Sequence, residues 1–238
     1  MTVSKIFREQ NLRINSSPYF SHYLEMKEAH DMVMEFYNRA SKFKYEDKVG
    51  FLDNVKKFTF SVEDLKNIVE DLENSCQDSI GAGILVKFGA SSNDFDSIDL
   101  LINGLIQNQD RSFSLLNDEF LTEFGPLTGI NFKRKFKNFL ASIEKLKEKH
   151  ENENFENELG GISHQTFSMN FGLIRNFKEM LISQQFIENQ IFLYLAYDKE
   201  SGHNTVIFSN DKNLELNIPN SEFFYFDRGQ GCCPPQWF

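Results

Sequence analysis

The sequence predicts an α+β fold in which a mostly helical N-terminal part is followed by a small antiparallel sheet. Up to residue 182, apolar residues recur mainly at the three-and-four spacing of amphipathic helices. From residue 190 onward they occur in short aromatic and β-branched runs separated by turn residues. Helices and strands thus occupy separate stretches of the chain instead of alternating, which favours helices beside an antiparallel sheet.

Cap and spacing signals locate the helices. Residues 18–45 form one helix or a pair after a cap-like start. The run Ser-Val-Glu-Asp beginning at Ser61 has the form of a capping box, and the helix that it starts is predicted to end near Asn74. A second cap signal at residues 91–94 precedes a predicted amphipathic helix over 98–106. Further helices are predicted over 132–143, running out into the charged stretch 144–158, and over 171–182.

Three consecutive strands are predicted near the C-terminus, over residues 190–197, 203–209 and 223–227. Asp, Asn, Gly and Pro residues separate them and supply turn chemistry. Three consecutive strands at this spacing predict an antiparallel sheet after the mostly helical first part.

The charge balance restricts the partners. The chain carries 25 Lys and Arg against 35 Asp and Glu, a formal net charge of −10, which disfavours nucleic acid and suggests a basic or neutral partner surface. The basic run from Lys133 to Lys149 is typical of the solvated face of a helix. No apolar stretch is long enough to span a membrane, and no Sec-type signal peptide is evident. The expected location is therefore the cytoplasm, or a host cell after export without a Sec signal.

Cysteine chemistry is the most specific functional candidate. Only three cysteines occur, Cys76, Cys232 and Cys233, which is too few for a disulfide framework and favours a reducing compartment. Cys76 stands where a helix is expected to begin, before the Gly- and Ala-rich residues 77–88. A thiol at a helix N-terminus has a lowered pKa and is a better nucleophile. A buried structural cysteine is the alternative.

A histidine and an aspartate occur on adjacent predicted strands. His203 follows Gly202 at the start of one strand, and Asp227 ends the next. A carboxylate beside an imidazole fixes its tautomer and stabilises its protonated form. His164 is the one rival histidine. For the oxyanion hole, the amides of Asn74 and Gln77 are the candidates beside the backbone N–H of the cysteine.

The pattern of a strand, a turn, Gly202-His203 and a strand, followed by a strand ending in Phe226-Asp227 and a Gly at position 231, resembles the C-terminal half of YopT-type cysteine proteases. These papain-like bacterial effectors are related to AvrPphB. The resemblance implies papain-like architecture, with Cys76 as nucleophile, His203 as general base and Asp227 as the residue that orients it. It also implies a secreted thiol protease with a role in virulence that acts on a protein, such as a host protein. Residues 1–60 would form an N-terminal helical extension and residues 61–238 the papain-like catalytic domain, with a single domain as the alternative.

Three classes of function follow, none of which requires a metal or another cofactor. The first is a cysteine hydrolase with a Cys-His-Asp triad, acting as a protease. The second is a glutamine deamidase or transglutaminase with the same triad, because both reactions pass through a thioester. The third is a non-catalytic acidic protein-interaction module, such as an immunity or adaptor protein.

Overall fold

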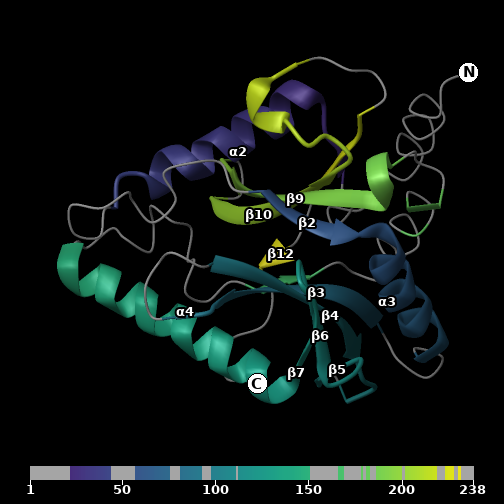
Figure 1. Cartoon of the computed structure of the whole chain (residues 1–238). Coiled ribbons are helices and arrows are strands. Elements are labelled where there is room, and N and C mark those ends of the chain that lie inside the picture. Colours follow the sequence, from purple (N-terminus) through teal and green to yellow (C-terminus); the bar gives the residue numbers. More distant parts are fainter. Residues whose placement is uncertain are drawn as a thin grey trace, which may run out of the picture.

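The computed structural model shows an α+β protein built on two antiparallel sheets that pack face to face (Figure 1). It describes residues 22–43, 57–75, 81–92, 98–110, 112–150, 166–168, 178, 181–182, 186–199, 202–218, 223–227 and 230–231. The α+β class expected from the sequence is confirmed. The two-sheet arrangement differs from a helical part followed by one small sheet, because one sheet is built largely from residues before 130.

The first sheet, here sheet A, contains the strands predicted near the C-terminus. Its order is β1, β11, β10, β9 and β2, and every neighbouring pair is antiparallel. These strands are β1 (His22–Tyr23), β2 (Lys57–Ser61), β9 (Gln190–Asp198), β10 (His203–Ser209) and β11 (Tyr225–Asp227). The β9–β10 hairpin turns at Gly202, whose positive φ of 73° is readily adopted by glycine.

The second sheet, here sheet B, is centred on a long hairpin of two ten-residue strands, β3 (Gly81–Ala90) and β4 (Ile98–Gln107). Its order is β12, β8, β3, β4, β6 and β7, and β5 also pairs with β4. The remaining strands are β5 (Phe113–Leu115), β6 (Glu119–Thr122), β7 (Gly125–Thr128), β8 (Thr166–Ser168) and β12 (Gln230–Gly231). At the edge of sheet A, the Thr59 N–H donates to Glu123 Oε1 at 2.6 Å, which links β2 to the β6–β7 turn.

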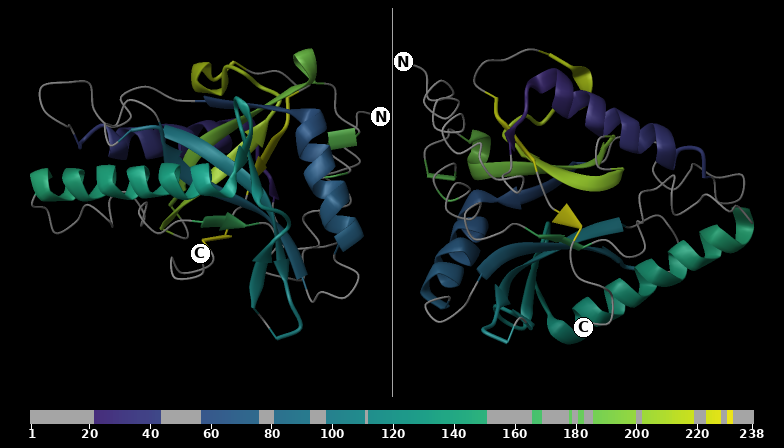
Figure 2. Two further views of the ribbon diagram at one scale, coloured as in Figure 1. Left: turned by 60° about the horizontal axis from the view of Figure 1, so that its bottom comes forward. Right: turned by 180° about the vertical axis from the view of Figure 1, so that it is seen from behind.

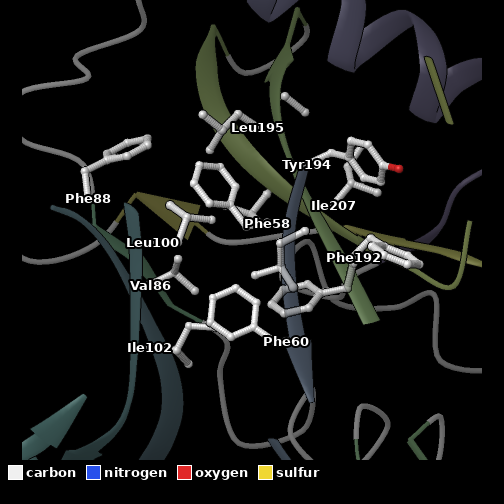
Figure 3. Packing of buried hydrophobic residues seen from close by; sticks show 14 of the residues in the cluster. Phe58, Phe60, Val86, Phe88, Leu100, Ile102, Phe192, Tyr194, Leu195 and Ile207 are labelled. Carbon is white, nitrogen blue, oxygen red and sulfur yellow. The ribbon is translucent and has the colours of Figure 1, made fainter. Parts of the chain in front are cut away.

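The main hydrophobic core lies between the sheets. Phe58 and Phe60 of β2 point toward Val86 of β3 and toward Leu100 and Ile102 of β4 (Figure 3). All five are at most 2% exposed. Burial of such side chains stabilises the fold by roughly 1.5–3 kcal/mol each, so the contact between the sheets is the main source of tertiary stability.

Three helices cover this sandwich in the described part of the chain (Figure 2). The helix α2 (Met26–Ala40) packs on the outer face of sheet A against β9. The helix α4 (Gly129–His150) packs against β3, and its first half covers the outer face of sheet B. The helix α3 (Val62–Ser75) contacts β4, β2 and β3 and buries Leu65, Val69 and Leu72 in the main core.

Two predicted features of the N-terminal half are wrong. Residues 98–106 form β4 and not an amphipathic helix, and the small-residue stretch that was expected to continue a helix after Cys76 contains β3 from Gly81. Both strands are buried on both faces, with sheet A or α3 on one side and α4 on the other. A strand buried on both faces has a nearly continuous apolar run in place of alternating polar and apolar residues. Such a run also contains apolar residues at the three-and-four spacing of a helix, so it can be mistaken for one.

Most of the other predicted elements are confirmed. The helix that starts at Ser61 is α3, and the Asp64 N–H donates to Ser61 Oγ at 3.3 Å, as a helix cap requires. Part of the first predicted helical segment forms α2, and α4 contains the predicted helix over 132–143. The proposed boundary at residue 60 falls inside β2, and both α2 and β2 contribute to the main core.

Candidate functional site

The predicted nucleophile and one oxyanion candidate, Cys76 and Gln77, lie outside the described residues. The other oxyanion candidate, Asn74, is exposed in the last turn of α3. Because α3 ends at Ser75 and β3 follows from Gly81, the chain passes from a helix to a strand here. The expected helix with its N-terminus at the cysteine, and the pKa argument that rested on it, therefore have no structural support.

The backbone separates α3 from the start of the His203 strand. Ser61, directly before α3, pairs with Gln190 at one end of β9, whereas His203 pairs with Asp198 at the other end. The eight residue steps between those ends correspond to about 26 Å at 3.3 Å per residue. In Figure 1, α3 leaves β2 at the end of sheet A where β9 begins. The helix before Cys76 thus starts far from the predicted general base.

The strand of His203 and the strand of Asp227 are neighbours, as predicted, but their register offsets the two residues. Asp227 is paired with Ile207 and His203 with Asp198. His203 is four positions from Ile207 along β10, so the two backbone sites are about 13 Å apart along the strand direction. A histidine and an aspartate that share a hydrogen bond across two strands usually occupy opposed or diagonal positions. The register therefore gives no support to a His203–Asp227 pair. The rival histidine, His164, lies outside the described residues.

A buried carboxylate, Asp211, organises the turn after β10. It is 2% exposed, and its oxygens accept hydrogen bonds from the Tyr225 hydroxyl at 3.0 Å and the Asn213 N–H at 2.8 Å. Its N–H donates to Ser209 Oγ at 2.9 Å, and its carbonyl accepts from the Tyr194 hydroxyl at 2.7 Å. Burial raises the pKa of both tyrosines, and the Asp211 carboxylate raises that of Tyr225 further. Both phenols therefore stay neutral donors, and the arrangement anchors a turn.

A second polar cluster fixes α4 to sheet B. The Lys135 Nζ contacts Asp99 Oδ2 and lies 3.0 Å from Ser91 Oγ. Asn138, one turn further along α4, donates to the carbonyls of Ala90 and Ser91 at 3.3 and 3.1 Å. All of these contacts join α4 to the end of β3 and the start of β4, so the cluster docks the helix on sheet B.

A buried lysine completes this contact. Lys87 of β3 is 1% exposed, and its Nζ lies 4.5 Å from the centre of the Phe136 ring on α4. A cation over an aromatic face is favourable, and more so when it is shielded from water. Both lysines at the α4–sheet B contact are therefore engaged in packing within the protein.

The opposite side of α4 has a different character. Ile130, Lys133, Arg134 and Lys137 are all exposed, and their spacing of three, four and seven residues puts them on one helical face. This set is here called the α4 stripe. Ile130 is 84% exposed, and among the described residues no carboxylate pairs with the three cations. The charge pattern in the sequence predicted a solvated face for these cations. Ile130 was not predicted as part of it, although its position away from the Phe residues of the helix is a signal for exposure.

The exposed side of α3 carries the opposite charge. Glu63, Asp64, Glu70 and Asp71 are all exposed on one side of the helix, away from the buried Leu72. They are here called the α3 acidic face. Within the described part of the chain, none of the four carboxylates forms an ion pair. The neighbouring Glu73 contacts Lys178, and Glu73 and, more weakly, Glu70 raise the pKa of that lysine. Two helices of one molecule thus display charges of opposite sign on their exposed sides.

The fold defines the chain as a two-sheet α+β protein whose described buried polar clusters serve packing and turns. Among the described residues, no helix is long and apolar enough to cross a membrane, and no group of three or more metal-binding side chains occurs. Comparison of the chain with protein-family models, with curated proteins and with solved structures finds no match.

Proposed function

We propose that the chain is a protein-interaction module that binds an acidic surface of a partner protein through the α4 stripe. The observation that carries this proposal is the grouping of Ile130, which is 84% exposed, with three cations that form no ion pair within the described residues. An apolar side chain beside charged ones is a usual composition of a small binding surface, in which an apolar anchor is bordered by polar groups.

The net charge of −10 does not prevent this binding. At about 0.1 M ionic strength the Debye length is about 10 Å, so an approaching partner responds mainly to the charges closest to it. Those of the α4 stripe are positive. Electrostatic complementarity of this kind increases the association rate and the specificity more than the affinity, which suits a regulatory or adaptor contact.

The test uses poly-L-glutamate as an acidic polypeptide, with its binding to the whole chain measured by isothermal titration calorimetry. Reversal of the stripe in the variant Lys133→Glu/Arg134→Glu/Lys137→Glu is expected to weaken binding at least tenfold. Exposed ion pairs contribute about 0.2–1 kcal/mol each, and 1.4 kcal/mol corresponds to a tenfold change. Wild-type protein that does not bind the polymer would overturn the proposal.

A matched control separates the stripe from net charge. The variant Lys27→Glu/Lys42→Glu/Lys212→Glu makes the same change in net charge at exposed lysines on other elements. It is expected to bind nearly as well as the wild type. An equal loss of affinity in both variants would mean that only the total charge matters, and the assignment to α4 would then be wrong.

The cysteine hydrolase hypothesis is tested separately. If Cys76 reacts with iodoacetamide at neutral pH no faster than a free model thiol, and His203→Ala leaves that rate unchanged, Cys76 is not an activated nucleophile. A fast reaction that depends on His203 would instead favour the hydrolase over a module without a catalytic thiol.

A further inference from the structure

The α3 acidic face and the α4 stripe cannot neutralise each other within one molecule. Leu72 of α3 packs over Gly104 of β4, and Lys135 of α4 packs over Gly89 of β3. Gly89 is paired with Asp99, which is five positions from Gly104 along β4. Because successive residues of a strand alternate between faces, the two helices dock on opposite faces of sheet B. In Figure 1 the ribbons of the two helices lie on different sides of sheet B, so the sides that they turn away from the sheet do not face each other.

Charge and exposure make the two surfaces complementary between molecules. The α4 stripe presents Ile130 followed by three cations, and the α3 acidic face presents four carboxylates, each on about two turns of a helix. Two helices packed side by side lie about 8–10 Å apart and bring residues at three-and-four spacing into contact. Oppositely charged pairs can then form along the whole contact.

We propose that the α4 stripe of one molecule binds the α3 acidic face of a second copy, so that the chain self-associates. This inference rests on the proposed function and names the partner of the same surface. Each molecule carries both surfaces, so the contact is either a head-to-tail one that extends to further copies or a two-fold dimer in which it occurs twice. In either case, association depends on protein concentration and is weakened by salt.

Sedimentation velocity of the whole chain over a range of concentrations tests the proposal. At about 0.1 M salt the weight-average sedimentation coefficient is expected to rise with concentration, and at about 1 M salt, where the Debye length falls to about 3 Å, the rise is expected to disappear. A coefficient that stays at the monomer value at every concentration in low salt would overturn the self-association.

Two charge-reversed variants identify the surfaces. The stripe-reversed variant is Lys133→Glu/Arg134→Glu/Lys137→Glu. The face-reversed variant is Glu70→Lys/Asp71→Lys, which places the new cations in the second half of α3, where the helix dipole tolerates them. Each variant alone is expected to be monomeric, with circular dichroism confirming that it is folded. In the stripe-reversed variant both surfaces are negative, and in the face-reversed variant Glu63 and Asp64 are balanced by two lysines, so the α3 face has no net charge left to attract the stripe.

A mixture of the two variants provides the decisive result. The native α3 face of the stripe-reversed variant meets the native α4 stripe of the face-reversed variant, so mixing is expected to restore association between two proteins that are monomeric alone. If each variant is monomeric and their mixture is too, the paired surfaces have been assigned wrongly.

The same variants separate this inference from the proposed function. The face-reversed variant keeps its α4 stripe and is expected to bind poly-L-glutamate at least as well as the wild type, although it no longer self-associates. If the wild type and this variant both bind poly-L-glutamate but the wild type stays monomeric, the second copy is the wrong partner, while the stripe remains a binding surface. If neither binds, the proposed function fails first.

Discussion

The helices α3 and α4 dock on the same sheet by the same means and differ in what they expose. Each buries an apolar face and approaches sheet B closely at a glycine, Gly104 for α3 and Gly89 for α4. On the outside, α3 is acidic and α4 combines cations with an exposed isoleucine. The buried faces of the two helices therefore stabilise the fold, whereas their exposed faces can differ and can bind partners. Substitutions on the two sides are therefore expected to affect different measurements.

The largest loss of stability is expected from Phe139→Ala on the buried side of α4. Phe139 is 1% exposed, and its ring stacks on Phe88 with centroids 5.0 Å apart. Truncating a buried Phe removes about 3–5 kcal/mol, which urea unfolding would measure. The control on the same helix is Ile130→Ala, where the side chain is 84% exposed and the change is expected to stay within about 0.5 kcal/mol. Equal losses in the free energy of unfolding at both positions would contradict the division of α4 into a buried side and an exposed side.

On α3 the corresponding substitution is Leu72→Ala. Leu72 is fully buried, and its Cδ2 atom faces the backbone of Gly104. The expected loss in the free energy of unfolding is about 2–5 kcal/mol, the range for a buried leucine. Glu70→Ala, at an exposed position on the same helix, serves as the control and is expected to change stability by less than about 0.5 kcal/mol. A loss below 1 kcal/mol for Leu72→Ala would mean that α3 is not needed to close the core.

The two glycines differ in how much space a Cβ atom would have. A Cβ atom at Gly104 would lie 2.7 Å from both Leu116 Cβ and Leu72 Cδ2, whereas at Gly89 the contact at 2.7 Å is with a single methyl group, Leu101 Cδ1. Side-chain methyl groups move more readily than a Cβ atom. Gly104→Ala is therefore expected to cost about 1–3 kcal/mol through overpacking, and Gly89→Ala less. Thermal unfolding of the two variants in parallel tests this order, and the reverse order would show that α4 is docked more tightly than α3.

The smallest effect on the free energy of unfolding is expected on α2. This helix serves as a reference because its carboxylate Glu35 forms ion pairs, unlike the carboxylates of the α3 acidic face within the described residues. Glu35 contacts Arg39 at 2.7 Å and Lys199 at 2.9 Å, and these partners, Lys199 first, lower the pKa of Glu35 below its ordinary 4.5. A lowered folded-state pKa stabilises the protein above the ordinary pKa, and this contribution is lost as the pH falls through the folded-state value. Glu35→Gln is thus expected to cost about 0.3–1 kcal/mol at pH 7.

Urea unfolding of the Glu35→Gln variant and the wild type from neutral to acidic pH measures this effect. The difference between the two proteins is expected to vanish in acid, where Glu35 is protonated in both the folded and the unfolded wild type. Glu148→Gln, at an exposed position on α4, is the control for a carboxylate outside this network. A difference for Glu35→Gln that is independent of pH would show that packing, and not charge, is responsible.

Prediction from sequence worked where the local signals are strong. The cap at Ser61 and the Phe face of α4 marked helices, and β9 and β10 were recognised from aromatic and β-branched runs between turn residues, although both strands are buried almost throughout. Prediction failed for β3 and β4, which are also buried on both faces but are rich in Gly, Ala and Leu. Without a period of two or a composition rich in aromatic residues, the residue spacing of a strand does not distinguish it from a helix.

The candidate site shows the same limit. The sequence correctly predicted that the strands of His203 and Asp227 are neighbours, since β10 and β11 do pair. Their offset by four positions was not predictable, because register depends on the loop between the strands and on the side chains that each face must bury. The basic residues of α4 were visible in the sequence, but which of them remain unpaired depends on Asp99 reaching Lys135 from another strand.

Several properties could be read from the sequence: the α+β class, the ends of helices buried on one side, the hairpin of β9 and β10, and the charges available to the surface. They follow from neighbouring residues, whose spacing and turn chemistry act locally. The folded chain was needed to show that β3 and β4 form a buried hairpin, that His203 and Asp227 are out of register, and that α3 and α4 expose opposite charges on opposite faces of one sheet. Each of these depends on contacts between residues far apart in the chain, which local patterns do not encode.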